Sequence, residues 1–171
     1  MSNVFVTADL HFSHENIIKY ENRPFKNICD MNERMIKNWN SVVSKHDKVF
    51  VLGDVSFDGK EETKQIISRL NGNKVLICGN HDRGRSVVEF WNYVGFKEVS
   101  KYPIIYKEFI VMSHEPPSYF NDATPYVYLY GHVHSSDMYK TITKNTACVS
   151  VERWNYTPVN IEKIFELMKI V

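Results

Sequence analysis

The sequence predicts an α/β protein, and three features of its apolar pattern support this prediction. Short apolar runs recur along the chain, and each run is followed by strand-breaking residues. In the first half, amphipathic helical patterns separate the runs, which is typical of βαβ units. In the second half, the runs succeed one another with few helical stretches between them. That arrangement favours antiparallel or mixed strands.

The apolar runs predict five strands that are buried mostly on both faces. They cover residues 4–6, 48–52, 74–78, 109–112 and 126–130. We expect further strands in the second half over residues 99–105 and 148–152. Helices are expected between and after the strands, over residues 32–44, 60–70, 85–93 and 161–170. The clearest is 32–44, where apolar residues recur at spacings of three and four and Asp30 can cap the first turn.

Composition limits the class of protein. The chain has 171 residues, of which 43% are hydrophobic and 24% charged, which predicts one globular domain over residues 1–171 rather than two domains or a disordered chain. The net charge of +1 gives no strong overall attraction for nucleic acid. The three cysteines form no C-x-x-C pair, and no apolar run is long enough to span a membrane. We therefore expect a cytoplasmic protein with no membrane partner.

Chemically active side chains follow each of the five apolar runs. They are Asp9 and His11, then Asp54, then Asn80, His81 and Asp82, then His114, and finally His132 and His134. Because the carboxyl ends of parallel strands meet at one edge of a sheet, we expect these side chains to converge on one cleft. Side chains two apart in an extended segment point the same way, so each D-x-H or H-x-H pair can bind neighbouring ions.

Each motif has an ordinary structural explanation when it is taken alone. A D-x-H or H-x-H pair is common by chance, and the glycines that precede Asp54, Asn80 and His132 suit a turn at a strand end. However, five of the seven histidines lie in these clusters. Histidines that served only as core or surface residues would not gather there, so the clusters indicate a site.

The ordered motifs D-x-H, G-D, G-N-H-D, H and G-H-x-H, from Asp9 to His134, resemble those of the calcineurin-like metallophosphoesterases. The opening D-x-H-F-x-H-x-x-I-I, with R-P-F at residues 23–25, is similar in particular to the short bacterial and phage members. The resemblance implies a four-layer αββα sandwich, in which two mixed β-sheets pack face to face with helices outside. It also implies a two-metal site at the C-terminal edge of the strands.

The resemblance assigns the metal ligands. It implies one ion held by Asp9, His11 and His134, a second held by Asn80, His114 and His132, and Asp54 as the bridge between them. A shared carboxylate offsets the repulsion of two cations about 3.5–4 Å apart. Imidazole, carboxylate and amide ligands suit several divalent metals, and we expect manganese first, with iron, nickel, cobalt or zinc as alternatives.

The reaction that this site implies is hydrolysis of a phosphoester. Water between two cations loses its proton near neutral pH, and the resulting hydroxide attacks phosphorus in line. We expect His81 to protonate the leaving oxygen as general acid, and Asp82 to orient His81. The alternatives are an electrostatic role for His81 at the transition state and a loop-capping role for Asp82.

Three further residues are candidates for contact with a substrate phosphate: His14, Arg23 and Arg83. Each has an alternative, because His14 can be a surface residue at a helix start and the two arginines can simply face solvent. The short chain has little room for a cap domain, so we expect an open site that favours phosphodiesters.

We expect the substrate to be a small phosphoester or nucleotide. A nuclease acting on DNA or RNA is an alternative, although the near-zero net charge counts against tracking along phosphates. A phosphomonoesterase or protein phosphatase is a further alternative. A scaffold that binds metal without turnover fits least well, because the ligand motifs and His81 are all present.

Overall fold

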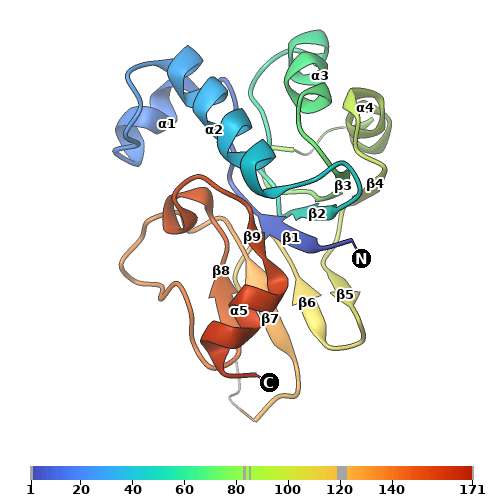
Figure 1. Cartoon of the computed structure of the whole chain (residues 1–171), viewed down its shortest axis with the longest axis vertical. Helices are drawn as coiled ribbons and strands as arrows, with labels where there is room; N and C mark the ends of the chain where they lie inside the picture. Colours follow the sequence, from blue (N-terminus) through green and yellow to red (C-terminus); the bar gives the residue numbers. More distant parts are fainter. Residues whose placement is uncertain (1, 83, 85, 119–122, 171) are drawn as a thin grey trace.

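The computed structural model describes residues 2–82, 84, 86–118 and 123–170, and within them the chain forms two packed β-sheets with helices (Figure 1). The first sheet has the order β4-β3-β2-β1-β9, and the second has the order β5-β6-β7-β8. β1 to β4 are parallel and β9 is antiparallel, whereas in the second sheet only β5 is antiparallel. The predicted α/β fold with two mixed sheets is therefore confirmed.

The elements follow one another in a regular order. In the first part of the chain they are β1 (Val4–Thr7), α1 (Glu15–Tyr20), α2 (Ile28–Val42), β2 (Lys48–Val51), α3 (Lys60–Ser68), β3 (Asn73–Ile77), α4 (Val87–Val94) and β4 (Glu98–Ser100). The second part contains β5 (Ile104–Tyr106), β6 (Ile110–Met112), β7 (Val127–Tyr130), β8 (Thr146–Cys148), a 3-10 helix (Val151–Trp154), β9 (Val159–Asn160) and α5 (Ile161–Met168).

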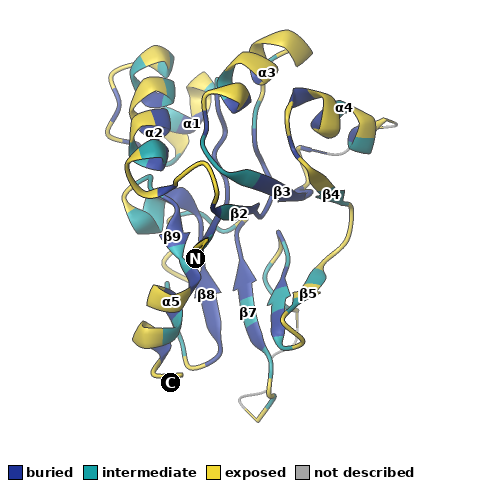
Figure 2. Ribbon diagram, turned by 45° about the vertical axis from the view of Figure 1, so that its right-hand side comes forward, coloured by how far each residue is buried: buried dark blue, intermediate teal, exposed yellow. Residues whose placement is uncertain are grey.

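The hydrophobic core has two parts, one on each face of the first sheet. On β1, Phe5 packs with the apolar faces of the helices, whereas Val6 faces the second sheet, because successive side chains of a strand point to opposite faces. Ile110 and Met112 of β6 meet the same inner layer. Figure 2 shows the inner strands as buried and the outer helix faces as exposed. Burial on both faces explains why these strands are continuous apolar runs.

Helix α2 starts earlier than the sequence predicts. The expected start at residue 32 with Asp30 as cap is wrong, because Asn27 caps the helix by accepting a hydrogen bond from the Asp30 N–H at 3.0 Å. The additional turn buries Met31 against the first sheet. Helix α5 contacts β1 and β9, and its apolar side contributes to the core between the sheets.

Two predicted strands are interrupted. Residues 99–105 do not form one strand, because the chain leaves the first sheet after β4 and enters the second at β5, with Pro103 in the connection. The strand expected over residues 148–152 ends at Cys148, and the 3-10 helix follows. At this point Ala8 donates to the carbonyl of Val149 and accepts from the N–H of Val151, which ties the end of β1 to the second sheet.

The ends of β1, β2, β3, β6 and β7 therefore open toward one edge shared by both sheets. The loops that leave these ends carry the polar clusters predicted from the sequence. Within the described residues, no helix is both long enough and apolar enough to span a bilayer.

Candidate dimetal site

Five of the candidate metal ligands occupy left-handed backbone conformations. They are Asp9 (φ 58°), His11 (φ 50°), Asp54 (φ 56°), His132 (φ 71°) and His134 (φ 46°). Such conformations cost about 1–3 kcal/mol each for residues other than glycine and persist only where the surrounding structure enforces them. Backbone hydrogen bonds supply that support: the N–H of Asp9 donates to the carbonyl of Gly53, and that of His11 to the carbonyl of Asp54.

Glycines precede three of the candidate ligands, Asp54, Asn80 and His132, and permit close packing of the ligand loops. A Cβ on Gly79 would collide with the Asp54 carboxylate, and one on Gly131 would collide with Ala8 and lie 2.7 Å from Asp9 Oδ2. Gly53 has φ +84° and would collide with His114. The glycines therefore bring the ligand loops within reach of one another, beyond the turn role that the sequence allowed.

One group of candidate ligands consists of Asp9, His11 and His134, whose donor atoms all lie within 4.8 Å of one another. The Nε2 atom of His134 lies 4.0 Å from Asp9 Oδ1. The Nε2 atom of His11 is buried and has no hydrogen-bond partner. Because buried polar atoms are nearly always satisfied, this orphaned nitrogen fits a residue whose partner is a cation.

A second group consists of Asn80, His114 and His132. Asn80 Oδ1 lies 2.9 Å from His114 Nε2 and 3.1 Å from His132 Nδ1, and the two histidine nitrogens lie 3.1 Å apart. Neighbouring ligands of an octahedral ion with bonds of about 2.1 Å are separated by about 3 Å. The triangle of donor atoms therefore has the dimensions of one face of a metal coordination shell.

Asp54 lies between the two groups. Its Oδ2 atom is 3.5 Å from His11 Nε2 and 3.5 Å from His114 Nε2. Its other oxygen, Oδ1, accepts a hydrogen bond from the backbone N–H of His81 at 3.0 Å. One carboxylate oxygen therefore faces a ligand from each group, while the other oxygen fixes the orientation of the carboxylate.

The imidazoles of His114 and His134 are each oriented by an oxygen atom at Nδ1. His114 Nδ1 lies 2.8 Å from the carbonyl of Leu52, and His134 Nδ1 lies 3.0 Å from Glu152 Oε1. A carbonyl or carboxylate at Nδ1 holds the proton on that nitrogen and leaves Nε2 as the free donor atom. Both rings therefore present Nε2 toward Asp9 or Asp54.

Burial shifts the pKa values of the candidate ligands and thereby sets their charge. Burial raises the pKa of the Asp9 carboxyl to about 6, even though His134 and His114 act in the opposite direction. Burial also lowers the pKa of His11 far below its ordinary value, so its imidazole stays neutral. Neutral imidazoles and buried carboxylates are the forms that bind divalent cations, so the residues present fit two such ions.

Arg23 does not reach the open side of the site, so the expectation that it contacts a substrate phosphate is wrong. Its side chain is fully buried, and Nη2 lies 2.6 Å from Glu152 Oε1. The guanidinium also donates to the carbonyls of Asp9 and Leu10, at 2.8 and 2.9 Å. Arg23 therefore supports the first ligand loop from behind, and this use of all its donors explains its burial.

Asp82 also has a structural position. Its carboxylate accepts hydrogen bonds from the backbone N–H groups of Asp54, Val55 and Gly79, at 2.6, 3.0 and 2.8 Å. These hydrogen bonds to Asp82 come from the backbone and not from the His81 ring that the sequence led us to expect. Of the two interpretations drawn from the sequence, the loop-capping one matches its hydrogen bonds, and it ties the Asp54 loop to the Asn80 loop.

His81 and His14 lie at the rim of the metal-ligand groups. The exposed ring of His81 is 5.8 Å from that of His11, measured between centroids. His14 Nδ1 lies 3.3 Å from His11 Nδ1, and burial lowers the pKa of His14. Both side chains therefore lie next to His11 of the first ligand group. Arg83, the remaining candidate, lies outside the described residues.

Two residues that the motifs did not indicate also belong to the site. Glu152 orients His134, and the exposed Phe57 stacks on His14 with ring centroids 4.0 Å apart. Glu152 is 18 residues beyond His134 and belongs to no sequence motif, so its contact with His134 can be recognised only from the folded structure. Phe57 follows Asp54 closely, but an aromatic residue after a G-D pair gives no distinctive signal.

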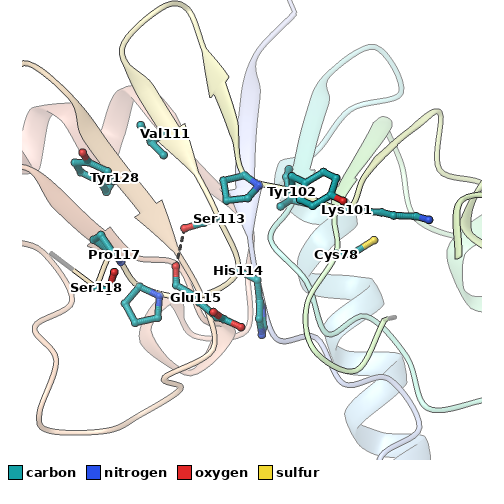
Figure 3. A pocket seen from close by; sticks show the side chains of 13 residues that line it. Cys78, Lys101, Tyr102, Val111, Ser113, His114, Glu115, Pro117, Ser118 and Tyr128 are labelled. Carbon is teal, nitrogen blue, oxygen red and sulfur yellow. Dashed lines mark hydrogen bonds between the residues drawn. The ribbon is translucent and has the colours of Figure 1, made fainter. Parts of the chain in front are cut away.

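A cleft of about 300 Å³ borders the site on the His114 side. Figure 3 shows His114 at one end of this cleft and the side chains of Lys101 and Tyr102 across it. Ser113 donates a hydrogen bond to the carbonyl of Glu115 at 2.6 Å and so fixes the turn that follows β6. The cleft therefore reaches the second ligand group through His114, which is one of its lining residues.

Comparison with known proteins agrees with this site. The sequence model of a family described as calcineurin-like phosphoesterase matches residues 2–158. The uncharacterized protein MJ1445 of Methanocaldococcus jannaschii is 35% identical over 175 residues, which cover 99% of this chain and 93% of that protein. The gene 66 protein of Mycobacterium phage L5 is 38% identical over 85 residues, which are 48% of this chain and 41% of that protein.

A solved structure has the same architecture. The crystal structure of the protein of unknown function AQ665 from Aquifex aeolicus aligns with a TM-score of 0.72 at 25% identity, and covers 98% of this chain and 100% of that one. The family match over most of the sequence supports a metal-dependent phosphoester hydrolase. The chain belongs to the calcineurin-like phosphoesterases, in the short form that also occurs in phages.

Proposed function

We propose that this protein is a phosphodiesterase that works with two divalent cations bridged by Asp54. The observation that carries the proposal is the position of Asp54 Oδ2, which is equidistant, at 3.5 Å, from His11 Nε2 and His114 Nε2. Asp54 Oδ2 thus lies between one imidazole of each ligand group. A carboxylate oxygen in this position can neutralise two cations at once.

The ligands divide as the sequence motifs suggest. Asp9, His11 and His134 hold one cation, and Asn80, His114 and His132 hold the other. The orphaned Nε2 of His11 and the close triangle around Asn80 Oδ1 support this division. Manganese is the metal we expect first, and iron, nickel, cobalt and zinc suit the same donor set.

When bound, the cations supply Lewis acidity toward the phosphoryl oxygens and lower the pKa of water at the site. His81 donates a proton to the oxygen that leaves phosphorus, as general acid. The backbone N–H of His81 donates to Asp54 Oδ1, which holds this residue next to the proposed bridging carboxylate. His14, next to His11, is placed to donate to a non-bridging phosphate oxygen.

A diester suits the site better than a monoester because two separate clefts adjoin residues that we assign to the reaction. One cleft is lined by His114 and another by His81. A phosphodiester carries two substituents, and the two clefts offer a place for each. A monoesterase has only one substituent to recognise and gains selectivity by enclosing the phosphate.

The first experiment compares hydrolysis of bis-p-nitrophenyl phosphate with that of p-nitrophenyl phosphate, with added Mn²⁺ and with a chelator. We expect metal-dependent turnover of the diester at a higher kcat/KM than that of the monoester. Preference for the monoester would contradict the proposal, and so would absence of turnover in protein that is shown to hold two metals.

Asp54→Asn tests the bridge. We expect the variant to lose both cations together, as measured by metal analysis after dialysis, because the lost charge faces both ligand groups. Glu166→Gln, which neutralises an exposed carboxylate on helix α5, is the matched control and should keep two metals. Two metals at full occupancy in Asp54→Asn would disprove the bridging role.

A further inference from the structure

Phe57 packs against three histidines of the site, yet the residue is 41% exposed. It stacks on His14, with centroids 4.0 Å apart and planes inclined by 13°, and on His11, at 5.2 Å and 19°. Its ring is also 4.9 Å from that of His81. An exposed phenylalanine beside metal ligands and the proposed general acid is not required by the core, so its exposed surface is available to a ligand.

The backbone holds this ring in place. The N–H of Phe57 donates to the carbonyl of Phe12 at 2.9 Å, and Ser56 pairs with Phe12 in a parallel bridge. Phe12 itself is fully buried next to His11. The backbone of Phe57 therefore links the loop of Asp9 and His11 to the loop of Asp54 and positions the ring at the edge of the site.

Phe57 and His81 line the same cleft, which has a volume of about 410 Å³. The cleft wall continues through Val87, Phe90 and Trp91 on helix α4. The indole N–H of Trp91 donates to the carbonyl of Asp82 at 3.2 Å, so the polar edge of this ring is already satisfied. The described wall thus has an apolar side, which Phe57 shares with helix α4, and a polar side that includes Ser56, Asp58 and Ser86. The volume is within the range of small-molecule sites.

A general acid must stand beside the oxygen that leaves phosphorus, so the cleft that His81 lines is the one that receives the leaving group. Aromatic rings attract planar rings through offset or face-to-face stacking, and nucleobases stack on them without sequence preference. We propose that this cleft is a subsite for a planar aromatic leaving group, such as an aryl or a nucleobase-bearing group, with Phe57 as its stacking face. This inference rests on the proposed phosphodiesterase function.

The cleft on the His114 side provides a control, because Tyr102 in its wall is also an exposed aromatic residue (Figure 3). Phe57→Leu removes the ring face and keeps an apolar side chain, Phe57→Trp keeps a ring, and Tyr102→Leu removes a ring from the other cleft. Thermal unfolding and metal content of each variant establish that it is folded and loaded.

The hydrolysis test uses two methyl phosphodiesters with leaving groups of comparable acidity, phenyl and hexafluoroisopropyl. We expect Phe57→Leu to lower kcat/KM for the phenyl ester about fivefold to tenfold and that for the fluoroalkyl ester less than about twofold. Phe57→Trp and Tyr102→Leu should keep the preference for phenyl. Equal losses on both esters in Phe57→Leu would overturn the proposal, because they would show that Phe57 only positions the histidines.

A binding test separates this inference from the proposed function. Calorimetry on metal-loaded protein compares adenosine monophosphate with the matching ribose phosphate, which differ only by the base. We expect tighter binding of the nucleotide, loss of that preference in Phe57→Leu and its retention in Phe57→Trp. A base preference that vanishes in Tyr102→Leu but survives in Phe57→Leu would place the ring in the other cleft and overturn the proposal. Absence of hydrolysis with the expected binding pattern would refute only the proposed activity.

Discussion

The Nδ1 atom of His134 lies 3.0 Å from Oε1 of Glu152, a residue outside every metal-ligand motif of the sequence. Burial alone would raise the pKa of Glu152, but its hydrogen bond with His134 and the Arg23 guanidinium outweigh burial and lower the pKa. The carboxylate is therefore charged and holds the imidazole with Nε2 toward Asp9. Such a carboxylate behind a ligating histidine fixes the ring and increases its basicity.

Glu152→Gln should weaken metal binding at one site more than at the other. The amide keeps the volume and an acceptor for His134 but removes the charge, so we expect an affinity about 10- to 100-fold lower for the cation held by Asp9, His11 and His134. Calorimetric titration with Mn²⁺ resolves the two binding events. Asp54→Asn, in contrast, should weaken both.

Glu166→Ala is the control for Glu152→Gln, because it removes an exposed glutamate on helix α5 that lies outside the ligand groups. We expect this variant to bind both cations normally. Equal weakening of the two binding events in Glu152→Gln, or no weakening of either, would contradict the orienting role of Glu152.

Arg23→Met should destabilise the fold. The Arg23 guanidinium neutralises the buried Glu152 carboxylate and satisfies two backbone carbonyls, so its removal leaves a buried charge without its partner. We expect a loss of about 3–5 kcal/mol in the free energy of unfolding, measured by urea denaturation of metal-free protein. The reason is burial of an uncompensated carboxylate rather than loss of a substrate contact.

The double variant Arg23→Met with Glu152→Leu tests that reason. Since neither charge remains, it should be more stable than Arg23→Met alone, although the carbonyls of Asp9 and Leu10 still lack a donor. A double variant that is less stable than either single variant would show that the pair is not the source of the loss.

The sequence predicted the strands and the grouping of polar residues well because both depend on local patterns. Apolar runs buried on two faces are visible without the fold, and so is a ligand-type residue shortly after each run. The residues behind the site could not be predicted in this way. Glu152 and Arg23 are 129 positions apart, and their pairing depends on the tie between the end of β1 and the second sheet.

One physical assumption made from the sequence also needs revision. The pairs Asp9 with His11 and His132 with His134 were expected to align because alternate side chains of an extended segment share a face. All four residues instead have positive φ. The loops are therefore coiled, and glycine contacts and backbone hydrogen bonds bring the side chains together where strand alternation does not.

His81→Ala should separate general acid catalysis from metal binding. We expect metal content to stay unchanged, because the contact of His81 with Asp54 is made by its backbone N–H, which alanine keeps. Diesters with poor leaving groups should react about 10²- to 10⁴-fold more slowly, and nitrophenyl diesters should be affected less. The exposed His46→Ala is the control. Equal losses on both kinds of ester would favour the electrostatic role instead.

The metal-free protein should lose stability as the pH rises through the titration range of Asp9. Burial raises the pKa of this carboxyl from 3.8 to about 6. Between these values the folded state keeps the proton that the unfolded chain has released, so the contribution is fully present below about pH 4 and lost above about pH 6. This rise in the pKa of Asp9 corresponds to roughly 3 kcal/mol of unfolding free energy.

Urea denaturation in the presence of chelator at about pH 4 and about pH 7 measures this loss. Asp9→Asn has no proton to release, so its stability should fall less over the same range than that of the wild type. Added Mn²⁺ should reverse the loss of stability with rising pH in the wild type. The ionised Asp9 carboxylate destabilises the metal-free fold, but it is the form that binds the cation. Identical pH dependence in the two metal-free proteins would show that the Asp9 carboxylate is stabilised without a cation.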